Sequence, residues 1–201
     1  PVICHDSKVD RTTNGKGLIS EMKWTDIKQL DAGIKTGPEW RGIRVPHFRE
    51  IVELIDNQAI LNIHIKNEGP NGKLMKKICD FVNQYNLLAY ISGSSQSVLQ
   101  EAKNYGADIE RACLKGQHTP SLQIESAQKF DCHRIQFGRM VKEKDIKKAH
   151  ELGLICNLFY SDDPTDAMGF LQKGIDVVLT NCANILFETG HFSPLKTSKW
   201  M

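Results

Sequence analysis

The sequence lacks the features that mark membrane-spanning, nucleic-acid-binding and nucleotide-binding proteins. Its apolar runs fall well short of the roughly 20 residues that a spanning helix needs, and no signal peptide is visible. The formal charge is only +2, and no basic run is interleaved with aromatic residues, which argues against a nucleic-acid surface. No strand-like run is followed by a dinucleotide- or phosphate-binding glycine pattern. The composition predicts one globular domain over residues 1–201.

The six cysteines also lack the spacing of a zinc site, because no two of them form a C-x-x-C pair. Four of them lie in or beside strand-like runs, where a reduced cysteine packs as a small hydrophobe: Cys4, Cys113, Cys132 and Cys156. An even number permits disulfides, but the spacing favours no particular pairing. We interpret the cysteines as thiols in a reducing compartment and predict a cytoplasmic protein.

Short apolar segments alternate with longer amphipathic ones along the chain. Strands are predicted near residues 2–5, 60–65, 88–92, 110–114, 132–137, 153–159 and 175–179. Helices are predicted near residues 46–57, 71–85, 95–105, 120–129, 142–152 and 164–173. Alternating strands and helices indicate a parallel sheet with right-handed crossovers.

Seven predicted strands are one fewer than an eight-stranded barrel contains, and such barrels typically take about 250 residues. We therefore predict an α/β fold, a TIM-like (β/α)8 barrel that lacks its first β/α unit in this chain. An open doubly wound sheet is the competing architecture. Residues 11–45 interrupt the alternation with a Gly- and Pro-rich segment that includes a short helical piece around WTDIKQL. We predict that this segment is an irregular insertion that forms a wall at the barrel mouth.

Candidate catalytic side chains occur at two predicted strands. His5 and Asp6 follow the first strand, and an imidazole suits proton transfer near neutral pH. Asp6 is placed to orient His5 or to support the second shell of a metal. On the second strand, Asn62, His64 and Lys66 fall on one side and three aliphatic side chains on the other. Phosphodiester hydrolysis needs a base, an acid and a cation, and Lys66 would be the cation.

Six sequence elements occur in order from Pro1 to about Asn184: HD, RTTNGKG, LDAG, IRVP, LNIHIK and GIDVVLTN. This ordered series resembles the glycerophosphodiester phosphodiesterase family. The resemblance implies a TIM-like barrel in which a His-Arg pair, a Glu-x-Asp pair, a His-Asp pair and a Glu-x-Lys strand converge at the barrel mouth.

The resemblance assigns roles only to residues that this chain supplies. His5 and Asp6 match the His-Asp pair, whose histidine is the acid/base group, and Lys66 matches the lysine that helps to hold the phosphate. The glutamate of the Glu-x-Lys motif is a metal ligand in the family, and His64 occupies its position. Phe159 stands at the position of a family tryptophan, where it would pack against a glycerol or acyl-bearing group. The His-Arg and Glu-x-Asp pairs do not occur in the 201 residues.

The resemblance implies a divalent metal cofactor, Mg²⁺ or Ca²⁺, whereas the imidazole of His64 suits Mn²⁺ or Zn²⁺ better. Three interpretations of His64 follow: a ligand that alters the metal preference, a residue whose presence costs the site its metal, or a hydrogen-bonded core histidine.

The implied function is metal-assisted hydrolysis of a small glycerophosphodiester or lysophospholipid-like substrate to glycerol 3-phosphate and an alcohol. Because most of the family's metal ligands are not among these residues, we expect weak activity or none from this chain alone. The alternative is a catalytically silent barrel that binds a phosphodiester or a protein partner.

Overall fold

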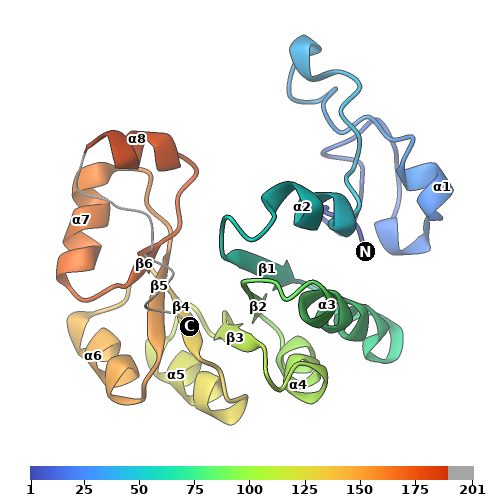
Figure 1. The fold of residues 1–201 in the computed structure, drawn as a ribbon. Coiled ribbons are helices and arrows are strands. Elements are labelled where there is room, and N and C mark those ends of the chain that lie inside the picture. The colour runs from blue at the N-terminus through green and yellow to red at the C-terminus, as the bar shows by residue number, and fades with distance from the viewer. Residues whose placement is uncertain (190–201) are drawn as a thin grey trace. The chain divides into compact units, whose positions relative to one another are not determined.

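The structure is a computed structural model that describes residues 1–189 (Figure 1). Its internal contacts divide the chain into two compact units, Pro1–Ile60 and Leu61–Met201. We call them the N-terminal unit and the sheet unit. The assignment of residues 1–201 to one barrel domain stays a prediction.

Six parallel strands form one sheet in the sheet unit, and they follow one another in chain order from β1 to β6. Their bounds are β1 Leu61–Ile65, β2 Ala89–Gly93, β3 Glu110–Cys113, β4 Arg134–Gly138, β5 Ile155–Phe159 and β6 Val177–Val178. All six coincide with predicted strands. A doubly wound sheet contains a point at which the strand order reverses. The described strands show no such reversal, so their order is that of a barrel.

Helices connect these strands and pack along the sheet (Figure 1). Their bounds are α3 Lys73–Gln84, α4 Gln96–Tyr105, α5 Pro120–Lys129, α6 Glu143–Glu151, α7 Pro164–Gln172 and α8 Ala183–Glu188. The first five confirm predicted helices. The sequence did not predict α8, because its six residues are too few to show a helical period.

The apolar core of this unit lies between the sheet and the helices. It includes Leu99 of α4, Ile135 and Phe137 of β4, Ile146 of α6 and Leu158 of β5, all of which are buried. Alternate residues of the same strands point to the opposite face of the sheet. In the described sheet the helices cover one face (Figure 1), which explains why the two faces differ in polarity.

The opposite face of the sheet carries buried polar side chains. The Asn157 Nδ2 group of β5 donates to the Tyr90 hydroxyl of β2 at 3.4 Å. The Arg134 guanidinium lies 4.6 Å from the centre of the Tyr90 ring, and its Nε donates to Glu110 Oε2 at 2.7 Å. Contacts between side chains of β2, β3, β4 and β5 stabilise a polar interior on this face.

The N-terminal unit is built from short helices and loops. Its helical segments are η1 Ile19–Glu21, α1 Trp24–Ile27, η2 Pro38–Trp40 and α2 Phe48–Ile55. The helix predicted near 46–57 is confirmed as α2, which His47 caps by accepting from Arg49 N. The predicted helical piece around WTDIKQL is confirmed as α1. A small core of Val9, Ile27, Leu30 and Val45 holds the loops together.

The prediction of a strand near residues 2–5 is wrong. Val2 makes only an isolated antiparallel bridge with His47. The backbone next to it is paired locally, since Ile3 N donates to Pro46 O at 3.0 Å and Phe48 N donates to Pro1 O at 2.9 Å. A run of three apolar residues predicted a strand, but the loop before α2 satisfies its backbone groups and no ladder develops.

The six cysteines are free thiols, of which Cys79, Cys113, Cys132 and Cys156 are buried. Burial raises the pKa of Cys79 to about 11 and that of Cys156 to about 12, which keeps both thiols protonated. The predicted packing role is thus confirmed for three of the four named cysteines, whereas Cys4 is half-buried. Within residues 1–189, no helix is both long and apolar enough to cross a membrane.

Candidate active site

The predicted catalytic pair is in direct contact. His5 Nδ1 lies 2.6 Å from Asp6 Oδ1, and the His5 side chain is 72% exposed, which leaves its ring accessible to a substrate. An ionised carboxylate only accepts hydrogen bonds. We therefore assign the proton to Nδ1, and Nε2 becomes the ring nitrogen that carries the lone pair.

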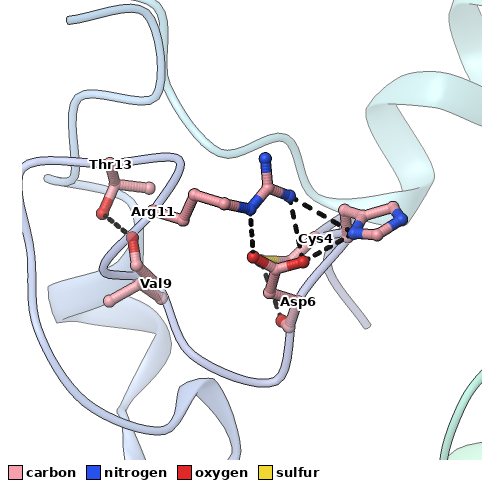
Figure 2. A network of polar contacts seen from close by, with 6 residues as sticks. Cys4, Asp6, Val9, Arg11 and Thr13 are labelled. Atoms are coloured by element: carbon pink, nitrogen blue, oxygen red, sulfur yellow. Dashed lines mark hydrogen bonds and ion pairs between the residues drawn. The ribbon is translucent and has the colours of Figure 1, made fainter. Parts of the chain in front are cut away.

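Arg11 completes this cluster on the other side of the carboxylate (Figure 2). Its Nε donates to Asp6 Oδ2 at 2.6 Å and its Nη2 donates to Asp6 Oδ1 at 3.0 Å. These hydrogen bonds from Arg11, followed by the contact with His5, hold the pKa of the Asp6 carboxyl well below its usual range. Asp6 in turn raises the pKa of Arg11. The carboxylate is therefore ionised throughout the physiological pH range.

The loop that carries Arg11 is closed by its own polar side chains. The Thr13 hydroxyl is buried and donates to Val9 O at 2.8 Å (Figure 2). Gly15 N donates to the same hydroxyl at 2.9 Å. Gly17 N donates to Asp10 Oδ2 at 2.8 Å, with Gly17 at φ 105°, where a side chain would be strained. The RTTNGKG motif thus folds back on the residues that precede it.

Asp31 organises the second half of the irregular segment. Its carboxylate accepts hydrogen bonds from Gly33 N at 3.0 Å, Ile34 N at 3.0 Å and Gly42 N at 2.9 Å. A Cβ at Gly33 would lie 1.7 Å from the Trp40 carbonyl oxygen, so only glycine fits there. Residues 11–45 form three short helical segments joined by loops. Their role as a wall at the barrel mouth stays a prediction.

The Asp31 carboxylate makes this loop sensitive to acid. The backbone hydrogen bond from Gly42, together with those from Gly33 and Ile34, lowers the Asp31 pKa from its ordinary value of 3.8. A lowered pKa stabilises the folded loop above pH 3.8, and this stabilisation is lost as the pH falls toward the folded-state pKa. We expect Asp31→Asn to weaken the acid dependence of unfolding. Denaturant titrations at pH 7 and at pH 3 would measure the free energy of unfolding of both proteins. The same acid dependence in Asp31→Asn as in the unmodified chain would contradict this prediction.

In the sheet unit, the predicted alternation along β1 is confirmed. Asn62, His64 and Lys66 are exposed, whereas Ile65 is buried. The Asn62 amide oxygen accepts from the Ser92 hydroxyl of β2 at 2.5 Å, so this face continues onto the next strand. Lys66 follows the carboxyl end of β1, and the carboxyl ends of the strands are where TIM-barrel enzymes place their chemistry.

Phe159 is also at a carboxyl end, that of β5. It is 47% exposed, and its ring lies 5.1 Å from that of Tyr160. Three strands separate β5 from β1 in the sheet order. The structure therefore brings His5 and Asp6 together in one unit, and in the other unit it places His64 on β1 and Lys66 directly after that strand.

The family model described as "Glycerophosphoryl diester phosphodiesterase family" matches residues 1–184. The chain belongs to this family. It is 43% identical to a glycerophosphodiester phosphodiesterase of Caldanaerobacter subterraneus subsp. tengcongensis over 188 residues, which cover 90% of this chain and 76% of that protein. It is 22% identical to a glycerophosphodiester phosphodiesterase of Bacillus subtilis, over 93% of this chain and 71% of that protein. The predicted family and enzyme class, a phosphoric diester hydrolase, are confirmed.

Solved structures of the glycerophosphodiester phosphodiesterase family share the fold. One is a phosphodiesterase of Oleispira antarctica in complex with the product sn-glycerol-3-phosphate, with a TM-score of 0.85, 24% identity, and coverage of 96% of this chain and 80% of that one. Another is the glycerophosphodiester phosphodiesterase of Thermotoga maritima, with a TM-score of 0.72, 13% identity, and coverage of 94% and 78%. The predicted TIM-like α/β fold is thus confirmed.

Glycerophosphodiester phosphodiesterases are generally metal-dependent, but the described residues offer little to a hard cation around His64. The His64 imidazole shares its strand face with the Asn62 amide and the positive charge of Lys66. Within residues 1–189, the one group of three side chains with donors close enough for a metal is His150, Cys156 and Asp176, and it does not include His64. Neither this group nor the residues around His64 fit a Mg²⁺ or Ca²⁺ site, which takes mainly oxygen ligands.

Arg11 is the residue of this polar cluster that sequence reasoning missed. It lies five positions after Asp6, within the RTTNGKG motif that carried the family resemblance. The signal was therefore present, but the motif alone does not say which of its side chains turns back toward the His-Asp pair.

Proposed function

We propose that this chain hydrolyses small glycerophosphodiesters, or lysophospholipid-like substrates, to glycerol 3-phosphate and an alcohol. The observation that carries the proposal is the contact between His5 Nδ1 and Asp6 Oδ1 in a chain that belongs to this family. The complex of the Oleispira antarctica phosphodiesterase with sn-glycerol-3-phosphate supports the choice of product.

His5 is proposed as the acid/base residue. With its proton on Nδ1, the neutral ring accepts a proton at Nε2 from the attacking oxygen, and the protonated ring can return it to the leaving alkoxide. Asp6 keeps the ring in this tautomer and offsets the positive charge that forms on it. In this proposal His5 moves the proton and Asp6 supports it.

Lys66 and Phe159 are proposed to bind the substrate. The Lys66 ammonium would offset the negative charge of the nonbridging phosphate oxygens, which increases as the attacking oxygen bonds to phosphorus. The exposed Phe159 ring would pack against the glycerol or acyl-bearing group of the substrate.

His64 is proposed as the metal-contacting residue of this chain. A bound divalent cation would supply a Lewis acid that polarises a phosphoryl oxygen. Because the donors around His64 do not form a complete site, we derive no step of the reaction through a metal.

The test is the release of glycerol 3-phosphate from glycerophosphocholine by the purified chain, with Mg²⁺, Ca²⁺, Mn²⁺ and Zn²⁺ in parallel. Turnover that depends on a metal supports the hydrolase and identifies the ion that His64 tolerates. If a folded sample shows no turnover with any ion, the proposal is wrong and a silent phosphodiester-binding barrel takes its place.

Replacing His64 by glutamate is expected to change the metal preference of this reaction. A carboxylate oxygen favours Mg²⁺ and Ca²⁺, whereas an imidazole favours Mn²⁺ and Zn²⁺. We expect His64→Glu to raise turnover with Mg²⁺ relative to that with Mn²⁺ by about tenfold or more, the scale on which metal-site changes act. His64→Gln, which has a similar size but no charge, is the matched control. An equal ratio in both variants would show that His64 does not contact the metal.

A further inference from the structure

We propose that Arg11 is a positioning residue, which holds the Asp6 carboxylate in the orientation that fixes the tautomer of His5. The proposal rests on the proposed function, because it gives Arg11 a role in the acid/base pair. The sequence resemblance gives Arg11 no role of its own, although Arg11 is the first residue of its RTTNGKG element.

The first argument is the geometry of the pair between Arg11 and Asp6. The two donors of the guanidinium contact different oxygens of the carboxylate, with Nε at 2.6 Å from Oδ2 and Nη2 at 3.0 Å from Oδ1. Such a fork fixes the rotation of the carboxylate plane, which a single hydrogen bond does not. The oxygen that is held by Nη2 is the same one that accepts from His5 Nδ1 at 2.6 Å. The guanidinium therefore determines where the partner of the imidazole lies.

The second argument concerns which ring nitrogen carries the proton. Arg11 Nη2 lies 3.3 Å from His5 Nδ1, and a guanidinium has no lone pair to offer. If Nδ1 carried the lone pair, it could accept from Arg11, but then two acceptor atoms, Nδ1 and Asp6 Oδ1, would face each other at 2.6 Å. The short distance from Nδ1 to Oδ1 favours a proton on Nδ1, shared with a carboxylate that Arg11 keeps ionised. Arg11 thus acts on His5 through Asp6.

The third argument is that hydrogen bonds fix the loop around Arg11, and fixing a loop costs conformational entropy. Thr13, one of the few buried polar side chains, fastens the loop to Val9 and Gly15. The Asn14 amide oxygen accepts from Asp31 N at 2.8 Å, and Asn14 N donates to Asp31 O at 3.2 Å. An exposed ion pair by itself contributes little to stability. A loop fixed on both sides of Arg11 is therefore better explained by the need to place its guanidinium.

The first test reads the tautomer directly and needs no activity. Nitrogen-15 NMR of the imidazoles separates a protonated Nδ1 from a protonated Nε2, and His5→Gln assigns the His5 signals. We expect the proton on Nδ1 in the unmodified chain, and a mixture of both tautomers in Arg11→Gln. Arg41→Gln is the matched control, because Arg41 is an exposed arginine of the same unit outside the cluster. An unchanged His5 tautomer in Arg11→Gln would overturn the proposal.

The second test separates positioning from a general loss of stability. We expect Arg11→Gln to lower kcat about 10- to 100-fold with little change in KM, which is the scale for losing a partner that orients a functional histidine. Arg11→Lys keeps the positive charge but not the two-pronged hydrogen bonding of the guanidinium, so it should recover only a minor part of the lost kcat. Guanidinium added at millimolar concentration should restore part of the activity to Arg11→Ala and none to His5→Gln. A higher KM with an unchanged kcat in Arg11→Gln would contradict the role of the fork. Full activity in Arg11→Lys would contradict it as well.

The two tests also separate this proposal from the proposed function. If the unmodified chain shows no hydrolysis but Arg11→Gln shifts the His5 tautomer, then the function fails and the positioning role stands. If hydrolysis occurs and the tautomer is the same in Arg11→Gln, then the function stands and Arg11 does not position the pair.

Discussion

Replacing His5 by glutamine is expected to lower the release of glycerol 3-phosphate by about 10²- to 10⁴-fold, the range over which a positioned acid/base group acts. Glutamine keeps the size and polarity of the side chain but cannot take up a proton. The Asp6 carboxylate and Arg11 should stay paired, because the bonds between them do not involve His5. The measurement is kcat for glycerophosphocholine at neutral pH, with the metal that gives the highest turnover.

The matched control for this variant is His150→Gln. His150 Nε2 pairs with Asp176 Oδ2 at 2.9 Å, and it lies near the end of α6, outside the candidate active site. We expect this control to change kcat by less than about twofold, because a half-exposed ion pair of this kind contributes little. If His5→Gln kept its turnover within threefold of the unmodified chain, His5 would not be the acid/base residue.

The sheet could be predicted from the sequence because its signals are local. Its six strands coincide with short predicted segments, and a helix such as α3 repeats apolar residues every three or four positions, at Met75, Ile78, Cys79 and Val82. The segment 2–5 gave the same local signal and was wrong, because pairing partners are set by the tertiary structure. Its backbone pairs with residues 46–48, which the sequence places far away.

The candidate site was predictable only in part, for a related reason. His5 and Asp6 are adjacent in the chain, so their contact needs no knowledge of the fold. The contact of Arg11 with Asp6 depends on the closure of the loop by Thr13, and the shape of residues 31–44 depends on three backbone groups that donate to Asp31. A pattern of residue types predicts which groups are present, but not which of them a loop brings together.

Replacing Lys66 is expected to have the second large effect on the rate of hydrolysis. The size of this effect depends on whether water surrounds the bound phosphate. Two unit charges 4 Å apart interact with about 1 kcal/mol in water and about 4 kcal/mol at an effective dielectric constant of 20. Removing the ammonium would therefore slow hydrolysis about fivefold if the phosphate stays hydrated, and about 10³-fold if the bound substrate excludes water. Lys66 is exposed in the structure without substrate, so either regime is physically accessible.

We expect Lys66→Met to lower kcat/KM at least 100-fold, because removing one group that stabilises developing charge commonly costs 10²- to 10³-fold in rate. Lys66→Arg should keep most of the activity, because it preserves the positive charge. Lys77→Met, on the exposed surface of α3, is the matched control and should leave kcat/KM unchanged. A loss well below about fivefold in Lys66→Met would mean that the phosphate is held elsewhere, because even a hydrated contact with the ammonium accounts for about fivefold.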